Sequence, residues 1–305
     1  MSTETPPPET DEPVDDEHAE DAAIEPSDDV ETASPGERRR AEKRARGAQA
    51  DTEWQTGTES SGDQETRTIT VFRYDPEVEE KASPHFDDFT VPYFKGMTVL
   101  DALIYARDEY DSSLTFRHSC RQAVCGSDAL FINGRQRLAC KTQLSALDDP
   151  VRVEPLPHAD VVKDLVVDME HFYDQMKSVD PFFDPDDLPK GELEEQKQSP
   201  ENREKIKMGT RCIWCGACMS SCNIAAGDNE YLGPAAINMA YRFAMDEREG
   251  EIKKEDRIRI IEQEHGVWRC QTQFSCTEVC PKDIPLTEHI QELKREAVKA
   301  NLKFW

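Results

Sequence analysis

The sequence has no long hydrophobic run. A membrane-spanning helix needs about 18 consecutive apolar residues, and no stretch approaches that length, so we expect no transmembrane helix. The first residues are acidic and proline-rich instead of basic and then apolar, so we expect no cleavable secretory signal. Glycine-rich nucleotide loops, flavin-site patterns and Ser-His-Asp arrangements are also missing, and the seven histidines are scattered. The sequence therefore offers no catalytic centre of these kinds.

Basic residues are scarce. The chain has 37 Lys and Arg against 63 Asp and Glu, a net charge of −26 over 305 residues. Phosphate backbones are bound by basic faces, so this deficit argues against nucleic acid as a partner. Net charge informs about solubility and association rather than fold, and we interpret the acidity as serving solubility. Docking to a basic partner is the alternative.

Residues 1–65 are nearly devoid of large apolar side chains and rich in Glu, Asp, Pro, Ser and Thr. Such a segment cannot bury enough surface to offset its ordering entropy, so we expect a disordered acidic tail. Its basic island, residues 38–46, is not followed by the apolar segment of a twin-arginine export signal. We interpret the island as a solvated charge patch.

Ten cysteines are present in a chain without a visible secretory signal, which favours metal ligation in a reducing compartment over disulfides. Cys212, Cys215, Cys218 and Cys222 follow one another at C-x2-C-x2-C-x3-C spacing. A tight turn lets the first three thiolates close around one face of a cubic iron–sulfur cluster. In two-cluster ferredoxins the fourth thiolate ligates the other cluster. The spacing therefore predicts a second cysteine set.

That second set is Cys270, Cys276 and Cys280, with the same spacing except that Gln273 stands where one cysteine is missing. The exchange of fourth ligands predicts one [4Fe–4S] cluster on Cys212, Cys215, Cys218 and Cys280. It predicts the other cluster on Cys222, Cys270 and Cys276. A side-chain amide is a poor iron ligand, so the corner at Gln273 should lose its iron and leave a [3Fe–4S] cluster. Zinc, the rival metal, usually needs only two C-x2-C pairs.

A third group, Cys120, Cys125, Asp128 and Cys140, has the C-x4-C-x2-X…C spacing of plant-type [2Fe–2S] ferredoxins, with Asp128 at the third cysteine position. Gly126 and the serine after it suit a loop that aims backbone N–H groups at sulfur. A carboxylate can ligate iron, although it is a harder donor than thiolate. We predict a [2Fe–2S] cluster with Asp128 as a ligand. The alternative is that Asp128 only caps the loop.

Strand signals surround this group. Residues 68–74 alternate like a half-buried strand, 85–94 predict a second strand, and 151–155 a third. Thr98 is expected to cap a helix over 99–107, and the Asn-Gly pair at 133–134 predicts a hairpin. Strands around one helix make a small α+β domain, which we place at 66–158.

The remainder reads as helical. We expect a helix over 160–176 and a polar linker at 184–204, so that 159–204 connects the two domains. Further helices are expected at 234–244, at 256–264 and at 287–297, the last capped by Thr287. Its apolar stripe Ile290, Leu293 and Ala297 is predicted to face the core. Residues 205–305 thus form a mainly helical domain with two clusters.

From about Thr68 to Lys299, the sequence resembles the iron–sulfur subunit of succinate dehydrogenase and fumarate reductase. The motifs that carry the resemblance are short and occur in one order: Ser119-Cys120-Arg121, Cys125-Gly126-Ser127, Asn133-Gly134, Leu138-Ala139-Cys140, Glu154 to Pro157, Asp164 to Asp168, Phe172-Tyr173, Cys212-Ile213, Gly233-Pro234-Ala235, Tyr241-Arg242-Phe243 and Cys280-Pro281. Asp at position 128 also occurs in members of that family.

The resemblance implies a β-grasp [2Fe–2S] ferredoxin domain followed by an all-α, bacterial-ferredoxin-like domain. It implies a FAD flavoprotein subunit that oxidises succinate, membrane anchor subunits and a quinone near the [3Fe–4S] cluster. This chain would pass electrons from flavin through [2Fe–2S], [4Fe–4S] and [3Fe–4S] to quinone without binding succinate. It would lie peripherally at the cytoplasmic face of the cell membrane. The family's cluster ligands fall on the positions that the spacing assigns.

Two departures from the family pattern concern the quinone side. Members often have Pro after the cysteine that matches Cys222 and a Trp shortly after it, whereas here Asn223 follows and the run to Gly233 is one residue shorter. Gln271 stands where members often have His. Three alternative functions stay open: fumarate reductase, which runs the same chain in reverse, a free-standing electron carrier, and a zinc-bound scaffold.

Overall fold

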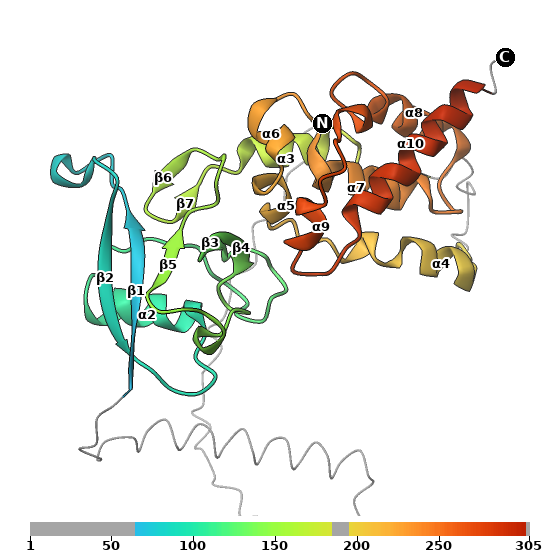
Figure 1. Ribbon diagram of the computed structural model, residues 1–305. Helices are drawn as coiled ribbons and strands as arrows, with labels where there is room; N and C mark the ends of the chain where they lie inside the picture. The colour runs from blue at the N-terminus through green and yellow to red at the C-terminus, as the bar shows by residue number, and fades with distance from the viewer. Residues whose placement is uncertain (1–64, 185–194, 303–305) are drawn as a thin grey trace, which may run out of the picture. The chain divides into compact units, whose positions relative to one another are not determined.

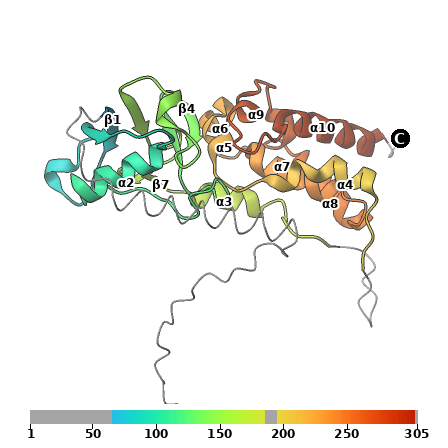
Figure 2. The same ribbon diagram turned by 90° about the horizontal axis from the view of Figure 1, so that it is seen from below.

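The computed structural model describes residues 65–184 and 195–302 of the protein (Figures 1 and 2). The predicted disordered tail lies outside these residues except for Glu65, and so does much of the predicted linker. The described residues belong to one compact unit. Among them, no helix is both long and apolar enough to cross a membrane. The predicted boundaries of the domains stay predictions.

The first part of the described chain forms a five-stranded mixed sheet (Figure 1). Its strands in chain order are β1 (Thr66–Arg73), β2 (His85–Pro92), β3 (Ala129–Ile132), β4 (Arg135–Leu138) and β5 (Val151–Glu154). They lie in the order β2-β1-β5-β3-β4, and β1 pairs parallel with β5 while the other neighbours are antiparallel. Asn133 and Gly134, both with positive φ, make the predicted tight turn between β3 and β4.

Helix α2 (Val99–Glu109) packs its apolar side on this sheet. Thr98 caps it as predicted, because its side chain accepts from the Asp101 N–H while the Asp101 carboxylate accepts from the Thr98 N–H. The buried residues of α2 and of strands β1, β3 and β5 form one core. Together the two hairpins, the parallel pair and the crossing helix give the β-grasp arrangement that the resemblance implied.

The predicted helix over 160–176 is wrong in its first half. Residues there form a short hairpin, β6 (Val161–Lys163) and β7 (Val166–Val167), and helix α3 starts only at Glu170 and ends at Lys177. Asp164 lies between the two strands with a positive φ of 45°. Its buried carboxylate accepts hydrogen bonds from the backbone N–H groups of Tyr74 and Thr115 and from the Arg73 guanidinium. These tertiary bonds hold the turn and exclude a helix.

The second half of the chain is helical, as predicted. Its α-helices are α4 (Pro200–Lys207), α5 (Ala217–Ser220), α6 (Asn223–Gly227), α7 (Gly233–Ala244), α8 (Glu251–Ile261), α9 (Ser275–Glu278) and α10 (Leu286–Leu302). Short 3-10 helices occur at Glu79–Lys81, Leu144–Ala146, Gly209–Arg211 and Val267–Arg269. Helix α10 lies along α7 (Figures 1 and 2), and both contribute to a second core.

Two details of the helical part differ from expectation. Helix α8 begins five residues before the predicted start, because Gly250 in extended backbone precedes it and the chain turns helical at once. Helix α10 begins at Leu286, so Thr287 is not its cap. The Thr287 hydroxyl instead lies within hydrogen-bond distance of the Thr277 hydroxyl, 3.0 Å away, and ties the helix to α9. The predicted stripe Ile290, Leu293 and Ala297 is confirmed as fully buried.

Candidate metal centres

The loop between α2 and β3 wraps a group of sulfurs with its own backbone. The Cys120 sulfur accepts from the N–H groups of Gln122, Val124 and Cys125 at 3.3–3.4 Å, and the Cys140 sulfur accepts from Ala123 at 3.3 Å. Arg121, Ala123 and Gly126 have positive φ, which turns successive N–H groups toward the inside of the loop. Amides that converge on sulfur stabilise negative charge there, as a metal–thiolate site needs.

Asp128 belongs to this group by position. Its side chain is 2% exposed, and one carboxylate oxygen, Oδ2, accepts from the Cys140 N–H at 2.6 Å. The other oxygen, Oδ1, is buried and has no hydrogen-bond partner among the described residues. An unpaired buried carboxylate oxygen is costly, and a metal ion is a partner that removes the cost. The site therefore offers three sulfurs and one open carboxylate oxygen.

The thiols of this first group differ in acidity. Hydrogen bonds from the amides of Gln122, Val124 and Cys125 lower the pKa of the Cys120 thiol to about 7. Burial, together with the neighbouring Asp128 carboxylate, raises the pKa of the Cys140 thiol to about 12. A thiol with such a raised pKa becomes a thiolate only when a positive charge is added, and bound iron supplies that charge.

A second cavity is lined by Cys212, Cys215, Cys218 and Cys280. Cys218 lies in α5, and Cys280 is the second residue after α9. Burial raises the pKa of the Cys218 thiol well above its ordinary value and that of Cys215 to about 12. Phe172, Ile284 and Leu286 are among the apolar residues of its wall. Four convergent thiols, of which that of Cys218 is buried and the other three are partly buried, fit a metal cluster, because metal ligation makes such a set of sulfurs stable as thiolates.

A third cavity is lined by Cys222, Cys270 and Cys276 together with Gln273. Cys222 is the second residue after α5, and Cys276 lies in α9. Each of these two short helices therefore contributes its own cysteine to one cavity, and the cysteine that follows the helix lines the other cavity. The structure thus groups the seven cysteines of the helical part into the same two sets that the spacing predicted.

The two loops that lead into α5 and α9 have the same backbone pattern. After Cys212, positive φ occurs at Trp214 (56°) and Gly216 (77°), and after Cys270 it occurs at Thr272 (58°) and Phe274 (64°). The residue between the two left-handed positions is Cys215 in the first loop and Gln273 in the second. Gln273 therefore occupies the place of a ligand, with an amide where the other loop has a thiol.

The first and second groups meet at Gly126. A Cβ built on Gly126 would lie 2.8 Å from the Cys215 Cβ and 2.8 Å from the Ile213 carbonyl oxygen. Cys140 and Cys215 also pack on one shared apolar cluster formed by Ala129, Leu138, Leu156 and Val167. Gln136 of β4 donates to the Ser220 carbonyl at 3.2 Å and so fastens the sheet to α5. The second group thus meets the first at Gly126, and it draws on the same two helices, α5 and α9, as the third.

Comparisons with known proteins agree with this arrangement. Residues 68–174 match the family described as a 2Fe-2S iron-sulfur cluster binding domain, and residues 208–284 match a 4Fe-4S dicluster domain. A fumarate reductase iron-sulfur subunit of Haemophilus influenzae is 37% identical over 76% of this chain and 93% of its own length. A mitochondrial succinate dehydrogenase iron-sulfur subunit of Oryza sativa subsp. japonica is 39% identical over 77% of this chain and 83% of its length.

The chain belongs to the family of succinate dehydrogenase and fumarate reductase iron–sulfur subunits. A solved structure described as the Mycobacterium smegmatis Sdh1 complex in the apo form contains a chain that superposes with a TM-score of 0.68. It is 27% identical, and the match covers 78% of this chain and 97% of that one. The chain is therefore an electron-transfer subunit of an oxidoreductase complex. The predicted fold class, a β-grasp ferredoxin domain followed by a helical one, is confirmed.

The contact at Gly126 gives a first prediction for this family member. Gly126→Ala should lower the free energy of unfolding by about 2–4 kcal/mol, because the new Cβ adds a clash with Cys215 and Ile213 to the strain at a φ of +73°. Electron transfer should also slow, because the two cluster loops are pushed apart. Denaturation followed by cluster absorbance measures the first effect, and pre-steady-state reduction of the clusters measures the second.

Gly134→Ala is the matched control for this change. Gly134 has nearly the same φ, +74°, but a Cβ there meets nothing within 4 Å. Only the backbone strain of about 1–2 kcal/mol is then expected. Equal losses of stability in the two variants would contradict the idea that the close approach of the two loops matters.

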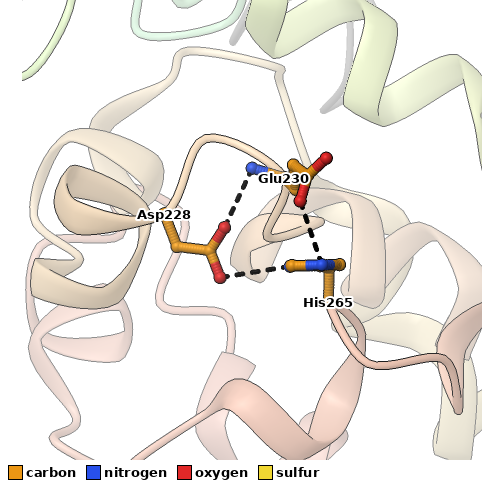
Figure 3. Close-up of side chains that lie close together, drawn as sticks. All are labelled: Asp228, Glu230 and His265. Atoms are coloured by element: carbon orange, nitrogen blue, oxygen red, sulfur yellow. Dashed lines mark hydrogen bonds and ion pairs between the residues drawn. The ribbon is translucent and has the colours of Figure 1, made fainter.

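One charged cluster was not found from the sequence. Figure 3 shows His265 between Asp228 and Glu230: Nδ1 lies 3.2 Å from Asp228 and Nε2 lies 3.0 Å from Glu230. The ligand atoms of these three residues are close enough for a metal ion. However, Arg269 Nε donates to the same Asp228 oxygen at 2.7 Å, and this bond lowers the pKa of the Asp228 carboxyl. We interpret the cluster as an ion-pair network that joins the segment after α6 to the segment before Cys270.

Proposed function

We propose that this chain is the iron–sulfur subunit of a succinate dehydrogenase that reduces a membrane quinone. Its partners would be a flavoprotein subunit with FAD, which oxidises succinate to fumarate, and membrane anchor subunits that hold the complex at the cytoplasmic face of the cell membrane. The observation that carries the proposal is the arrangement of three cysteine groups, in which the second group meets the first at Gly126 and draws on the same helices, α5 and α9, as the third. When bound, the three clusters supply one-electron carriers in series between flavin and quinone.

The proposed ligands follow from the three groups. The [2Fe–2S] cluster is held by Cys120, Cys125, Asp128 and Cys140. The [4Fe–4S] cluster is held by Cys212, Cys215, Cys218 and Cys280. The [3Fe–4S] cluster is held by Cys222, Cys270 and Cys276. The open Asp128 oxygen and the position of Gln273 between two left-handed residues support these assignments.

Residues of this chain hold the three groups in fixed positions relative to one another. Gln136 and Lys141 fasten the sheet to the helical part by donating to the carbonyls of Ser220 and Pro281. On the far side, Lys294 of α10 donates to the Cys270 carbonyl at 3.0 Å and holds the loop of the third group. Sulfurs on loops that are fixed in this way let electrons pass with little rearrangement of the protein, which is what a relay requires.

Fumarate reduction is the second candidate, because relatives of both names match this chain. The direction is set by the flavoprotein and by the potential of the quinone, so the purified complex must be assayed both ways. Succinate–quinone turnover at least tenfold faster than quinol–fumarate turnover, a margin chosen for the assay, supports the proposed direction. The reverse ratio would replace it by fumarate reductase.

The carrier and zinc alternatives are tested on the same preparation. EPR spectra of the membrane fraction, oxidised and reduced, should show three distinct cluster signals, and a large flavoprotein should co-purify with the chain. A monomeric chain that is active alone would support a free-standing carrier. A colourless purified protein would support a zinc scaffold.

A further inference from the structure

The third cavity contains a buried hydroxyl group that nothing in the described part of the chain accounts for. Tyr231 lines this cavity beside Cys222, Cys270 and Cys276, and its side chain is 0% exposed. Its hydroxyl has no hydrogen-bond partner among the described residues. Buried hydroxyl groups are rarely left unpaired, because they give up their bonds to water on burial. The hydroxyl therefore indicates a partner inside the cavity.

The cysteine sulfurs of the cavity influence the acidity of this hydroxyl. Burial first, and then the negative charge of the Cys270, Cys222, Cys276 and Cys218 thiolates, raise the pKa of the Tyr231 hydroxyl far above its ordinary value. The group stays protonated and so acts as a hydrogen-bond donor. No cysteine sulfur of the described chain is close enough to accept from it. A sulfide of the cluster, which would lie between the cysteines, is the remaining acceptor of the right charge.

The backbone around Tyr231 is held on both sides. Before it, the Tyr231 N–H donates to the Asp228 carbonyl at 3.2 Å, in the turn that the ion-pair network of Figure 3 stabilises. After it, the Leu232 N–H donates to the His265 carbonyl at 2.9 Å. The ring itself packs in the core with α7 and α10. A side chain fixed at so many points is suited to place a donor at one atom.

We propose that the Tyr231 hydroxyl donates a hydrogen bond to a sulfur of the three-iron cluster and raises the reduction potential of that cluster. Hydrogen bonds to the sulfurs are among the factors that set cluster potentials. A donor stabilises the reduced form more than the oxidised form, because the reduced cluster carries one more negative charge. The three-iron cluster then holds the electron more favourably before it passes to the quinone. This inference rests on the proposed [3Fe–4S] site at Cys222, Cys270 and Cys276.

Tyr231→Phe in the intact complex tests the inference, since it removes only the hydroxyl. A redox titration followed by the EPR signal of the oxidised three-iron cluster should show a more negative midpoint potential. We expect a fall of up to about tenfold in the reduction equilibrium constant, which is about 59 mV for one electron. The matched control is Tyr241→Phe, because the buried Tyr241 hydroxyl donates to Glu292 at 2.9 Å and lies outside the cavity. In Tyr241→Phe, the midpoint potential of the three-iron cluster should equal that of the wild type.

A second measurement does not depend on the potential. After exchange into D2O, pulsed EPR of the wild-type complex should show a deuteron coupling to the three-iron cluster that Tyr231→Phe lacks, while couplings from backbone amides such as the Thr272 N–H, which donates to the Cys270 sulfur at 3.4 Å, remain in both. Wild-type complex without such a deuteron, or a variant with unchanged potential and unchanged coupling, overturns the inference. Wild-type complex with no three-iron signal at all overturns the cluster assignment instead, so the two failures are distinguishable.

Discussion

Asp128→Asn should abolish the [2Fe–2S] cluster and with it the succinate–quinone turnover of the complex, while Asp128→Cys should keep the cluster. The argument rests on the two carboxylate oxygens. One accepts from the Cys140 N–H at 2.6 Å, and the other is buried without a partner in the described chain. Asparagine keeps an oxygen that can accept from the Cys140 N–H. Toward iron, however, it offers only a neutral side-chain amide, which is a poor ligand. Cysteine supplies a thiolate, the ligand that plant-type ferredoxins use at this position.

The loss of iron affinity in Asp128→Asn should be large. Loss of a group that only orients a metal ligand already costs about 10- to 100-fold in metal affinity, so loss of a ligand should cost more. Iron content, visible absorbance and the EPR signal of the reduced complex measure the cluster directly, and turnover should fall with them. If Asp128→Asn keeps full cluster content and an unchanged EPR signal, Asp128 only caps the loop. Asp128→Ala, which removes both oxygens, should lose the cluster as well, and unchanged cluster content and EPR in that variant would exclude direct ligation.

Local signals in the sequence predicted most of the fold that surrounds these sites. Thr98 and Asp101 form a capping box that depends only on residues three apart, and the Asn-Gly turn at 133–134 needs only two residues of positive φ. Within one cysteine run the spacing is a local signal too, because one tight turn brings the first three positions together. The capping box and the turn were predicted correctly because their causes lie within a few residues of one another.

The failures have causes that are distant in the sequence. Residues 161–169 have apolar positions compatible with a helix, but the chain turns at Asp164 because Arg73 and the amides of Tyr74 and Thr115 bind its carboxylate. Those partners lie 49 to 91 residues away. Thr287 is likewise of a residue type that often caps helices, but its hydroxyl pairs with that of Thr277 on another helix. No local pattern contains this information.

The residues whose proposed roles the sequence did not reveal also depend on partners that are distant in the sequence. Tyr231 is an ordinary tyrosine in the sequence, and its open hydroxyl emerges only when Cys222 and Cys270, 48 residues apart by number, line one cavity with it. Gly126 had been predicted to shape its own loop. Its second role, which is to let Cys215 approach, depends on a loop of the other half of the chain.

Gln273→Cys should convert the three-iron cluster into a four-iron cluster. Gln273 lies between the left-handed residues Thr272 and Phe274, as Cys215 lies between Trp214 and Gly216. A thiolate at this place would complete a fourth corner, as Cys215 is proposed to do in the neighbouring cavity. The EPR signal of the oxidised complex should then disappear, and a signal of the reduced complex should take its place. Iron content should rise by one atom per complex.

This change should also slow quinone reduction strongly. A four-iron cluster in this position should have a lower potential than a three-iron one, and each tenfold change in its reduction equilibrium constant corresponds to about 59 mV for one electron. The last carrier would then be harder to reduce from the cluster before it, so we expect turnover to fall at least about tenfold. Gln271→Cys is the control, since it adds a thiol to the wall of the same cavity but out of register with Cys215. It should keep the three-iron signal. A Gln273→Cys complex that retains the oxidised three-iron signal at full intensity would show that the missing cysteine is not what excludes the fourth iron.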